Sequence, residues 1–306
     1  MRAVSLLPSA TELCYALGVE PVGVSHECDH PPAANDQPVV VHSRVDADAS
    51  STEIDEQVQE AVATGGVYEL DRERLRALDP DVILSQGVCE VCAVDDADVH
   101  RAVADLGLGA DIVTTDPHSL GDVFTDLERI GAVLDREERA REVVAGWRDR
   151  VTDIERTTPD EGPRVAVLDW LDPVMVAGHW LPGMVERVGG QYGLADAGDP
   201  SRPREWADIR AYDPEVLVAA PCGFDIAQTR ENWTDLTARE GWSSLTAVAN
   251  DRVYVIDGDQ YVNRPGPRLV DTLELLAGIV NPDHTPTVAD RDGVRRLSGP
   301  ADGPRA

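Results

Sequence analysis

Two cysteines lie close enough together in this chain to share chemistry. Cys89 and Cys92 form a C-x-x-C pair in the stretch SQGVCEVCAV. That spacing occurs both in metal sites and in dithiol redox centres. The surroundings lack the aromatic residues of a thioredoxin motif, which disfavours redox exchange. The pair alone does not distinguish a metal site, a redox centre and a pair without function. Other residues of the chain are needed to choose among these three.

Other reactive side chains follow predicted β-strands. His26, Glu27 and Cys28 follow a strand near Val22–Val24, His179 and Trp180 follow one near Val174–Val176, and Cys222 follows Val216–Ala219. Ligands of parallel α/β sheets bind beyond the C-terminal strand ends, so we expect these groups to converge in one cleft. The hypothetical metal set is Cys28, Cys89, Cys92, Cys222, His26 and His179. Four nitrogen or sulfur ligands suit a transition metal such as zinc.

Structural alternatives exist for several of these residues. Cys222 also suits a buried strand end, and Cys14 lies on an apolar helix face that predicts a core position. His42, His100, His118 and His284 have no partner in the pattern and are predicted to be surface residues.

Along the sequence, short apolar runs typical of strands alternate with helical patterns, and these elements must position the side chains named above. This alternation predicts an α/β fold with largely parallel sheets, built as two similar α/β lobes joined by one helix. We expect an N-terminal lobe at 1–134, a long connecting helix at 135–157, a C-terminal lobe at 158–280 and a polar, disordered tail at 281–306.

The composition is strongly acidic. The chain has 57 Asp and Glu against 27 basic residues, a net charge of −30, and all of its basic residues are arginines. Such a surface repels nucleic acids and anionic lipids, which makes both poor partners. The acids are spread along the whole chain, which favours adaptation to molar salt, as in halophilic organisms, over an acidic site.

The N-terminus MRAVSLLPSATEL lacks the longer apolar run and cleavage site of a secretory signal. No stretch reaches the roughly 20 apolar residues of a membrane span. The sequence as given therefore predicts a cytoplasmic protein that does not span a membrane.

Several segments carry a family resemblance. AVSLLPSATELCYALGVEPVGVSHECDHPP, ERLRALDPDVILSQG, DPVMVAGHWLPGMVERVGG and DRVYVIDGDQYVNRPGPRLVDTLELLAG resemble the cobalamin and iron–siderophore substrate-binding proteins of ABC importers. The likeness covers about residues 2–280, and its SHECD and CEVCAV motifs resemble a subgroup labelled cobalamin-binding. It implies the class III binding-protein fold, with two Rossmann-like lobes joined by a rigid helix, a ligand in the cleft and a monomer. Family members are usually extracytoplasmic, so the missing secretion signal is a departure from the family.

The resemblance also implies roles for individual residues. The ligand cleft would be lined by His26, Glu27, Arg44, Trp170, His179, Trp180, Trp206, Tyr261 and Arg264, with Arg268 nearby. The aromatic side chains would form walls for a flat ligand, and the arginines would pair with its carboxylate, amide or phosphate groups. Glu73 and Asp208, or Glu205 in place of Asp208, would dock onto arginines of the permease.

Three functions compete. The first is a binding protein for cobalamin or a related metal chelate, working with an ABC permease and having no enzymatic activity. A second is a cytosolic metal sensor or chaperone that uses the cysteines directly. The third is an enzyme, either a thiol oxidoreductase or one using Asp169 and His179 as acid and base. No phosphate loop, Ser-His-Asp order or H-E-x-x-H motif favours the third.

Overall fold

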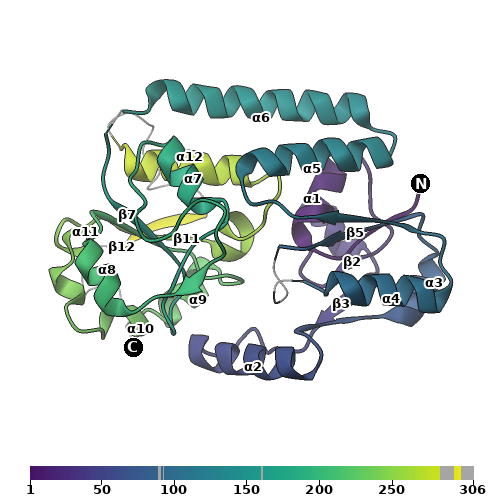
Figure 1. The fold of residues 1–306 in the computed structure, drawn as a ribbon, viewed down its shortest axis with the longest axis horizontal. Coiled ribbons are helices and arrows are strands. Elements are labelled where there is room, and N and C mark those ends of the chain that lie inside the picture. The colour runs from purple at the N-terminus through teal and green to yellow at the C-terminus, as the bar shows by residue number, and fades with distance from the viewer. Residues whose placement is uncertain (89–90, 92, 160, 283–292, 298–306) are drawn as a thin grey trace. The chain divides into compact units, whose positions relative to one another are not determined.

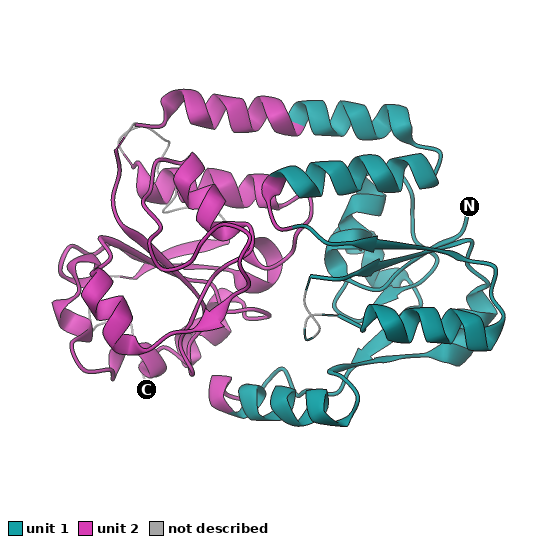
Figure 2. Ribbon diagram, in the orientation of Figure 1, with its two compact units in different colours: residues 1–49, 53–117, 121–146 teal, residues 50–52, 118–120, 147–306 magenta. Residues whose placement is uncertain are grey.

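The computed structural model describes residues 1–88, 91, 93–159, 161–282 and 293–297. The chain divides into two compact units (Figure 2). Unit 1 holds residues 1–49, 53–117 and 121–146, and unit 2 holds residues 50–52, 118–120 and 147–306. Helix α6 (Glu137–Thr157) contributes residues to both units. Helix α6 covers most of the connecting helix that the sequence predicted at 135–157.

Unit 1 is built on two small sheets. One has the order β1-β5-β6 and the other β2-β3-β4. Backbone hydrogen bonds between β1 and the segment before β2, such as Ser5 N to Gly23 O at 2.9 Å, join them. All pairs are parallel except β3 with β4. The strands are β1 (Ala3–Ser5), β2 (Val24–Ser25), β3 (Val39–Ser43), β4 (Tyr68–Leu70), β5 (Val82–Gln86) and β6 (Asp111–Thr115).

Local signals set the helix boundaries of unit 1. Asp71 caps α3 by accepting a hydrogen bond from Arg74 N, and α4 starts at the Asp95 cap and ends at Gly107, whose φ is 65°. Positive φ is accessible to glycine at little cost. The helices are α1 (Pro8–Ala16), the 3₁₀ turn η1 (Pro32–Asp36), α2 (Ser51–Thr64), α3 (Arg72–Leu78), α4 (Asp96–Leu106) and α5 (Leu120–Val133) (Figure 1).

Unit 2 has one six-stranded sheet with the order β12-β11-β10-β7-β8-β9. Its centre, β11-β10-β7, is parallel, as predicted, and the outer strands pair antiparallel. β7 and β10 are buried at every position, so they form the core of the sheet. The strands are β7 (Val165–Trp170), β8 (Met175–Val176), β9 (Arg202–Pro203), β10 (Val216–Ala219), β11 (Val253–Ile256) and β12 (Val294–Leu297).

The helices of unit 2 are mostly short. Among them α12 is the most apolar and packs against α7 (Figure 1). They are α7 (Leu181–Arg187), α8 (Trp206–Tyr212), α9 (Ile226–Glu231), α10 (Thr234–Thr237), the 3₁₀ turn η2 (Trp242–Ser244), α11 (Thr246–Ala249), the π-helical turn η3 (Gly258–Val262) and α12 (Leu269–Val280).

One prediction about the C-terminal tail is wrong. We expected residues 281–306 to be disordered, but Val294–Leu297 form β12 and pair antiparallel with β11. Val294 is only 1% exposed and Leu297 8%, so burial of two apolar side chains and the ladder hydrogen bonds hold this segment. Residues 283–292 and 298–306 lie outside the described residues.

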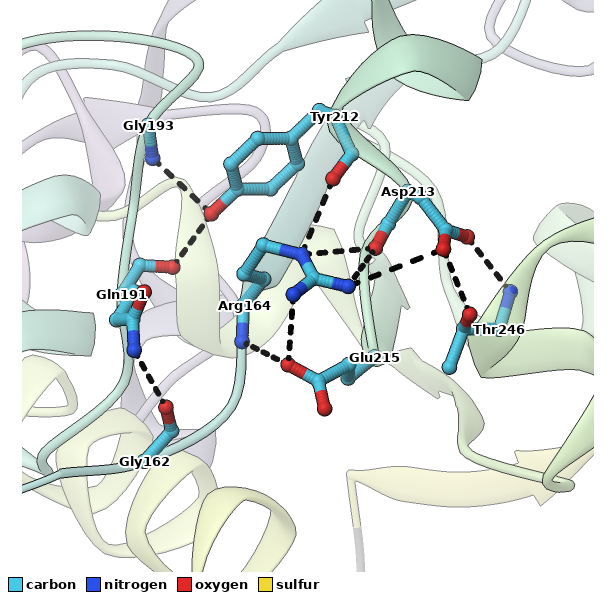
Figure 3. Close-up of polar contacts among 8 residues, drawn as sticks. All are labelled: Gly162, Arg164, Gln191, Gly193, Tyr212, Asp213, Glu215 and Thr246. Atoms are coloured by element: carbon cyan, nitrogen blue, oxygen red, sulfur yellow. Dashed lines mark hydrogen bonds and ion pairs between the residues drawn. The ribbon is translucent and has the colours of Figure 1, made fainter.

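A polar cluster closes the N-terminal end of the parallel strands in unit 2 (Figure 3). The Arg164 guanidinium donates to the carbonyl oxygens of Tyr212 and Asp213 at 2.8–3.1 Å and lies 3.4 Å from Glu215. The Asp213 carboxylate accepts from the amide and hydroxyl of Thr246, which lowers its pKa. These charged side chains pair with one another, and Arg164 also donates to the backbone carbonyls at the C-terminal end of α8. The cluster therefore has a structural role.

Candidate ligand-binding site

The C-terminal strand ends of unit 2 are joined by direct contacts. β7 ends at Trp170, whose ring centroid lies 5.1 Å from that of Phe224 in the segment after β10. The Phe224 carbonyl accepts hydrogen bonds from Gly258 N at 3.0 Å and Asp259 N at 3.2 Å, at the start of η3. Trp170 is 8% exposed and Phe224 2%, so both rings are packed within unit 2.

His179 and Trp180 follow β8 in a turn. The Trp180 indole donates to Val262 O in η3 at 2.9 Å and is 6% exposed, so it packs within unit 2. The His179 ring is half-buried, 5.5 Å from the Trp180 ring and 6.1 Å from that of His118. Its φ of 51° is unusual for a residue with a side chain. His118, expected to have no partner, is therefore a neighbour of His179.

Backbone contacts enforce that turn. His179 N donates to Asp199 O at 2.5 Å and Gly198 N donates to His179 O at 2.9 Å. A Cβ on Gly178 would lie 2.2 Å from Asp199 O, so only glycine permits this close approach. The loop before β9 thus clamps the turn that carries His179.

The predicted arginines of unit 2 are engaged internally. Arg264 is 6% exposed and donates to Asp259 at 2.8 Å. Arg268 is 7% exposed, and its guanidinium carbon lies 5.7 Å from the centroid of the Tyr261 ring. Contact of these residues with a ligand stays a prediction.

Trp206 belongs to an aromatic cluster on unit 2. Its ring stacks on Trp242 at 6.2 Å, and Trp233 meets Trp242 edge-on at 5.7 Å. The Arg239 guanidinium carbon lies 5.9 Å from the Trp206 ring centroid, and its nitrogens donate to Asp172 and to the Leu171 carbonyl. These contacts give Trp206 a packing role, and its role as a ligand wall is a prediction.

In unit 1 the predicted His26 and Glu27 meet two further residues. The Tyr68 hydroxyl donates to Glu27 at 2.9 Å, and the His26 ring lies 6.1 Å from Tyr68 and 6.5 Å from His42. His26 Nδ1 lies 3.1 Å from Val41 O. Because a carbonyl only accepts, this contact favours the tautomer with the proton on Nδ1, and Nε2 lies 3.8 Å from Glu27 Oε1.

Arg44 follows β3 in unit 1 and lies near β4. Its Nε is 3.9 Å from Glu69 Oε2, and NH1 donates to Gly66 O at 3.4 Å. Both charged side chains are well exposed, so this ion pair contributes little to stability and leaves Arg44 able to turn toward a ligand.

The thiolate metal site finds no support in the described residues. Cys28 is 3% exposed in a small core with Val24 and Ala34, and its sulfur lies 3.1 Å from Thr11 Oγ1. Cys222 is exposed. Throughout the described ranges, no three His, Cys, Asp or Glu side chains are grouped to hold a metal ion. Cys89 and Cys92 lie outside those ranges, so their roles stay predictions.

The residues predicted to dock onto a permease lie on helices. Glu73 is exposed in α3 beside a hollow of about 500 Å³ lined by His42, Glu69, Leu70, Asp71, Arg72 and Glu73. Asp208 and Glu205 are exposed at the start of α8. Their docking role stays a prediction.

Asp169 is a buried acid near the C-terminal end of β7. Burial raises the pKa of its carboxyl to about 6, opposed by hydrogen bonds from Ser201 and from its own backbone amide. Within the described part of the chain, Oδ1 has no hydrogen-bond partner. An acid in this state is proton-bound at mildly acidic pH.

Sequence reasoning missed Tyr68, His42, His118 and Phe224 as neighbours of the predicted residues. Phe224 follows Cys222 by two residues at a predicted strand end, so its position was a usable signal. Tyr68 and His42 lie on neighbouring strands, and β4 was not predicted. His118 comes from a loop whose contact with His179 is long-range and leaves no sequence pattern.

Comparison with known proteins gives distant relatives over most of the chain. An uncharacterised ABC transporter substrate-binding lipoprotein of Bacillus subtilis is 25% identical over 92% of this chain and 80% of its own length. A vitamin B12-binding protein of Vibrio cholerae is 23% identical over 89% and 86%. The structure of a periplasmic haem-binding protein of Pseudomonas aeruginosa matches with a TM-score of 0.73 at 21% identity, over 97% of this chain and 98% of that one.

These relatives lend no support to the predicted cytoplasmic location, because they are named as a lipoprotein and as a periplasmic protein. In the part of the chain that the structure describes, no helix has both the length and the apolar character needed to cross a bilayer.

A family model adds an independent match. The model for the periplasmic binding protein family matches residues 4–260, most of the chain. The family binds substrates and does not transform them, which disfavours the enzyme alternatives. The two α/β units are consistent with the fold of the matched binding-protein structures. The chain therefore belongs to the periplasmic binding protein family, in the class III group of ABC-importer substrate-binding proteins.

Proposed function

We propose that this protein binds cobalamin or a related corrinoid as an intact metal chelate and delivers it to an ABC permease. The observation that carries the proposal is His26. Its Nδ1 lies 3.1 Å from the Val41 carbonyl and its side chain is 32% exposed, so Nε2, 3.8 Å from the Glu27 carboxylate, is the nitrogen we assign as the axial ligand of a chelated metal ion. His179, half-buried after β8, is the corresponding candidate in unit 2.

Aromatic side chains supply the apolar contacts that a large flat ligand needs. Tyr68 and His42 flank His26 in unit 1, and in unit 2 the 8%-exposed Trp170 ring lies at the end of β7 beside the buried Phe224. Contact of a flat ring system with an aromatic side chain contributes about 1–3 kcal/mol in comparable stacking sites.

The net charge favours a corrinoid over haem. Haem carries two carboxylates, and a protein of charge −30 repels an anionic ligand at low salt. A corrinoid, neutral or cationic overall, avoids that repulsion. The vitamin B12-binding relative supports the same choice, and the haem-binding structure keeps haem as the competing ligand.

The permease partner is proposed from charge. Glu73 on α3 and Asp208 on α8 are exposed carboxylates on helix starts, suited to arginine side chains of a membrane partner. Charge reversal at both positions is expected to abolish transport by a reconstituted permease while leaving ligand affinity unchanged.

The experiment is a titration of the purified protein in 2 M KCl with aquocobalamin and with hemin, followed by visible absorption. Aquocobalamin exchanges its axial water for imidazole, which shifts the corrin bands. His26→Ala is expected to remove that shift and to raise Kd about tenfold, equivalent to ~1.4 kcal/mol.

The matched control is His100→Ala, because His100 is an exposed histidine on α4 whose Nδ1 also faces a carbonyl, that of Asp96. This variant is expected to bind like the wild type. Binding of neither probe by the wild type would contradict the proposal. Equal loss of affinity in both variants would remove His26 from it.

A further inference from the structure

We propose that Asp169 and Ser201 are positioning residues that hold the turn of Gly178 and His179, and through it set the orientation of the His179 ring. The role in ligand binding rests on the proposed function, but the positioning itself is a property of the ligand-free protein.

The first step is the hydrogen bond between strands. β8 and β9 run antiparallel with Val176 opposite Arg202, so the next positions in this register are Ala177 and Ser201. One residue further on, Gly178 N donates to the Ser201 hydroxyl oxygen at 3.0 Å. A side chain therefore holds the backbone at Gly178, just before His179.

The second step is the orientation of that hydroxyl. A hydroxyl that accepts from Gly178 N must send its own hydrogen elsewhere, and the Asp169 carboxyl accepts it. Asp169 lies in β7 and is 9% exposed. Tyr192, 8% exposed, donates to Ala177 O at 2.6 Å and so anchors the residue before the turn.

The third step connects this buried set to His179. The amide that Ser201 holds belongs to Gly178, and His179 follows with φ 51°. Such a conformation persists only where surrounding contacts over-determine it. Its ring lies near those of Trp180 and His118, so a change in the turn re-aims the ring. Ser201 and Asp169 act on the ligand only through this turn.

The test uses the ring signals of His179 in NMR spectra of the ligand-free protein, assigned by their loss in His179→Gln. Ser201→Ala is expected to shift these signals and to raise the Kd for aquocobalamin about threefold to tenfold, the range expected for one lost hydrogen bond. Ser201→Thr keeps the hydroxyl and is expected to restore both. Ser244→Ala removes an exposed hydroxyl bonded to Gly241 O, and is expected to change neither.

Unmoved His179 signals in Ser201→Ala would overturn the inference. If that variant fails to fold, Asp169→Leu serves in its place, since it roughly keeps the side-chain volume and removes the acceptor for the Ser201 hydroxyl, and unmoved signals in that variant would overturn the inference equally. Moved signals in a protein whose wild type binds neither aquocobalamin nor hemin would support the positioning role and contradict the proposed function.

Discussion

Three carboxyl groups of this protein are buried in a way that opposes ionisation. Burial raises the pKa of Asp126, Asp169 and Asp257 from 3.8 to about 6 in each case. For Asp126 the nearby Arg129 guanidinium, at 2.8 Å, offsets part of the effect. A folded-state pKa above the unfolded value means that the folded protein holds more protons between about pH 4 and 6, so each group stabilises the fold less as pH rises through that window.

Asp169→Asn tests this at the carboxyl whose Oδ1 is buried and has no hydrogen-bond partner in the described part of the chain. In 2 M KCl, the free energy of unfolding of the wild type is expected to fall as pH rises from 4 to 6.5. In the variant, this decrease in the free energy of unfolding is expected to be smaller by on the order of 2–3 kcal/mol, because a difference of one pKa unit corresponds to about 1.4 kcal/mol. Urea unfolding at several pH values measures it. Parallel curves for both proteins would contradict the assignment.

Arg164→Ala tests the structural cluster of Figure 3. The variant loses hydrogen bonds to the carbonyls of Tyr212 and Asp213, and is expected to lose roughly 1–3 kcal/mol of stability with ligand affinity unchanged. Arg156→Ala is the control, since the 71%-exposed Arg156 pairs only with Asp153 among the described residues and is expected to change stability by less than about 0.5 kcal/mol. Equal effects in both variants would refute the structural role.

At the scale of elements, a strand that is fully buried was easier to predict from the sequence than a helix that buries few residues. The strand Val216–Ala219 was predicted with its observed limits because a short continuous apolar run marks a core strand. Helix α8 was missed because WADIRAY buries only Ile209 and shows no apolar period. The turn at His179 was missed because it depends on contacts with residues about twenty positions away.

β12 gives the element-scale prediction. Val294→Asp places a charge at a position 1% exposed and is expected to destabilise the protein by about 2–4 kcal/mol in thermal or urea unfolding. Arg295→Ser, on an exposed position of the same strand, is expected to be nearly neutral. A neutral Val294→Asp would mean that β12 does not pack on the sheet in solution.

At the scale of the molecule, the charge of −30 is the dominant property. Mutual repulsion of the carboxylates weakens the compact state at low salt and is screened as the Debye length falls to about 3 Å at 1 M salt. The melting temperature is therefore expected to rise steeply between 0.1 and 1 M KCl and to level off above. A flat response, measured by calorimetry across that range, would show that the charge has no bearing on stability.

The central claim is that the protein binds an intact metal chelate. The most direct measurement is equilibrium dialysis of the chelator-washed wild type in 2 M KCl against aquocobalamin, hemin and zinc chloride in parallel, with metal analysis and visible spectra of the retained protein. One equivalent of aquocobalamin with shifted corrin bands, in preference to hemin, is the expected result. Stoichiometric zinc uptake with neither chelate retained would contradict the account and return the function to direct metal binding by the cysteines.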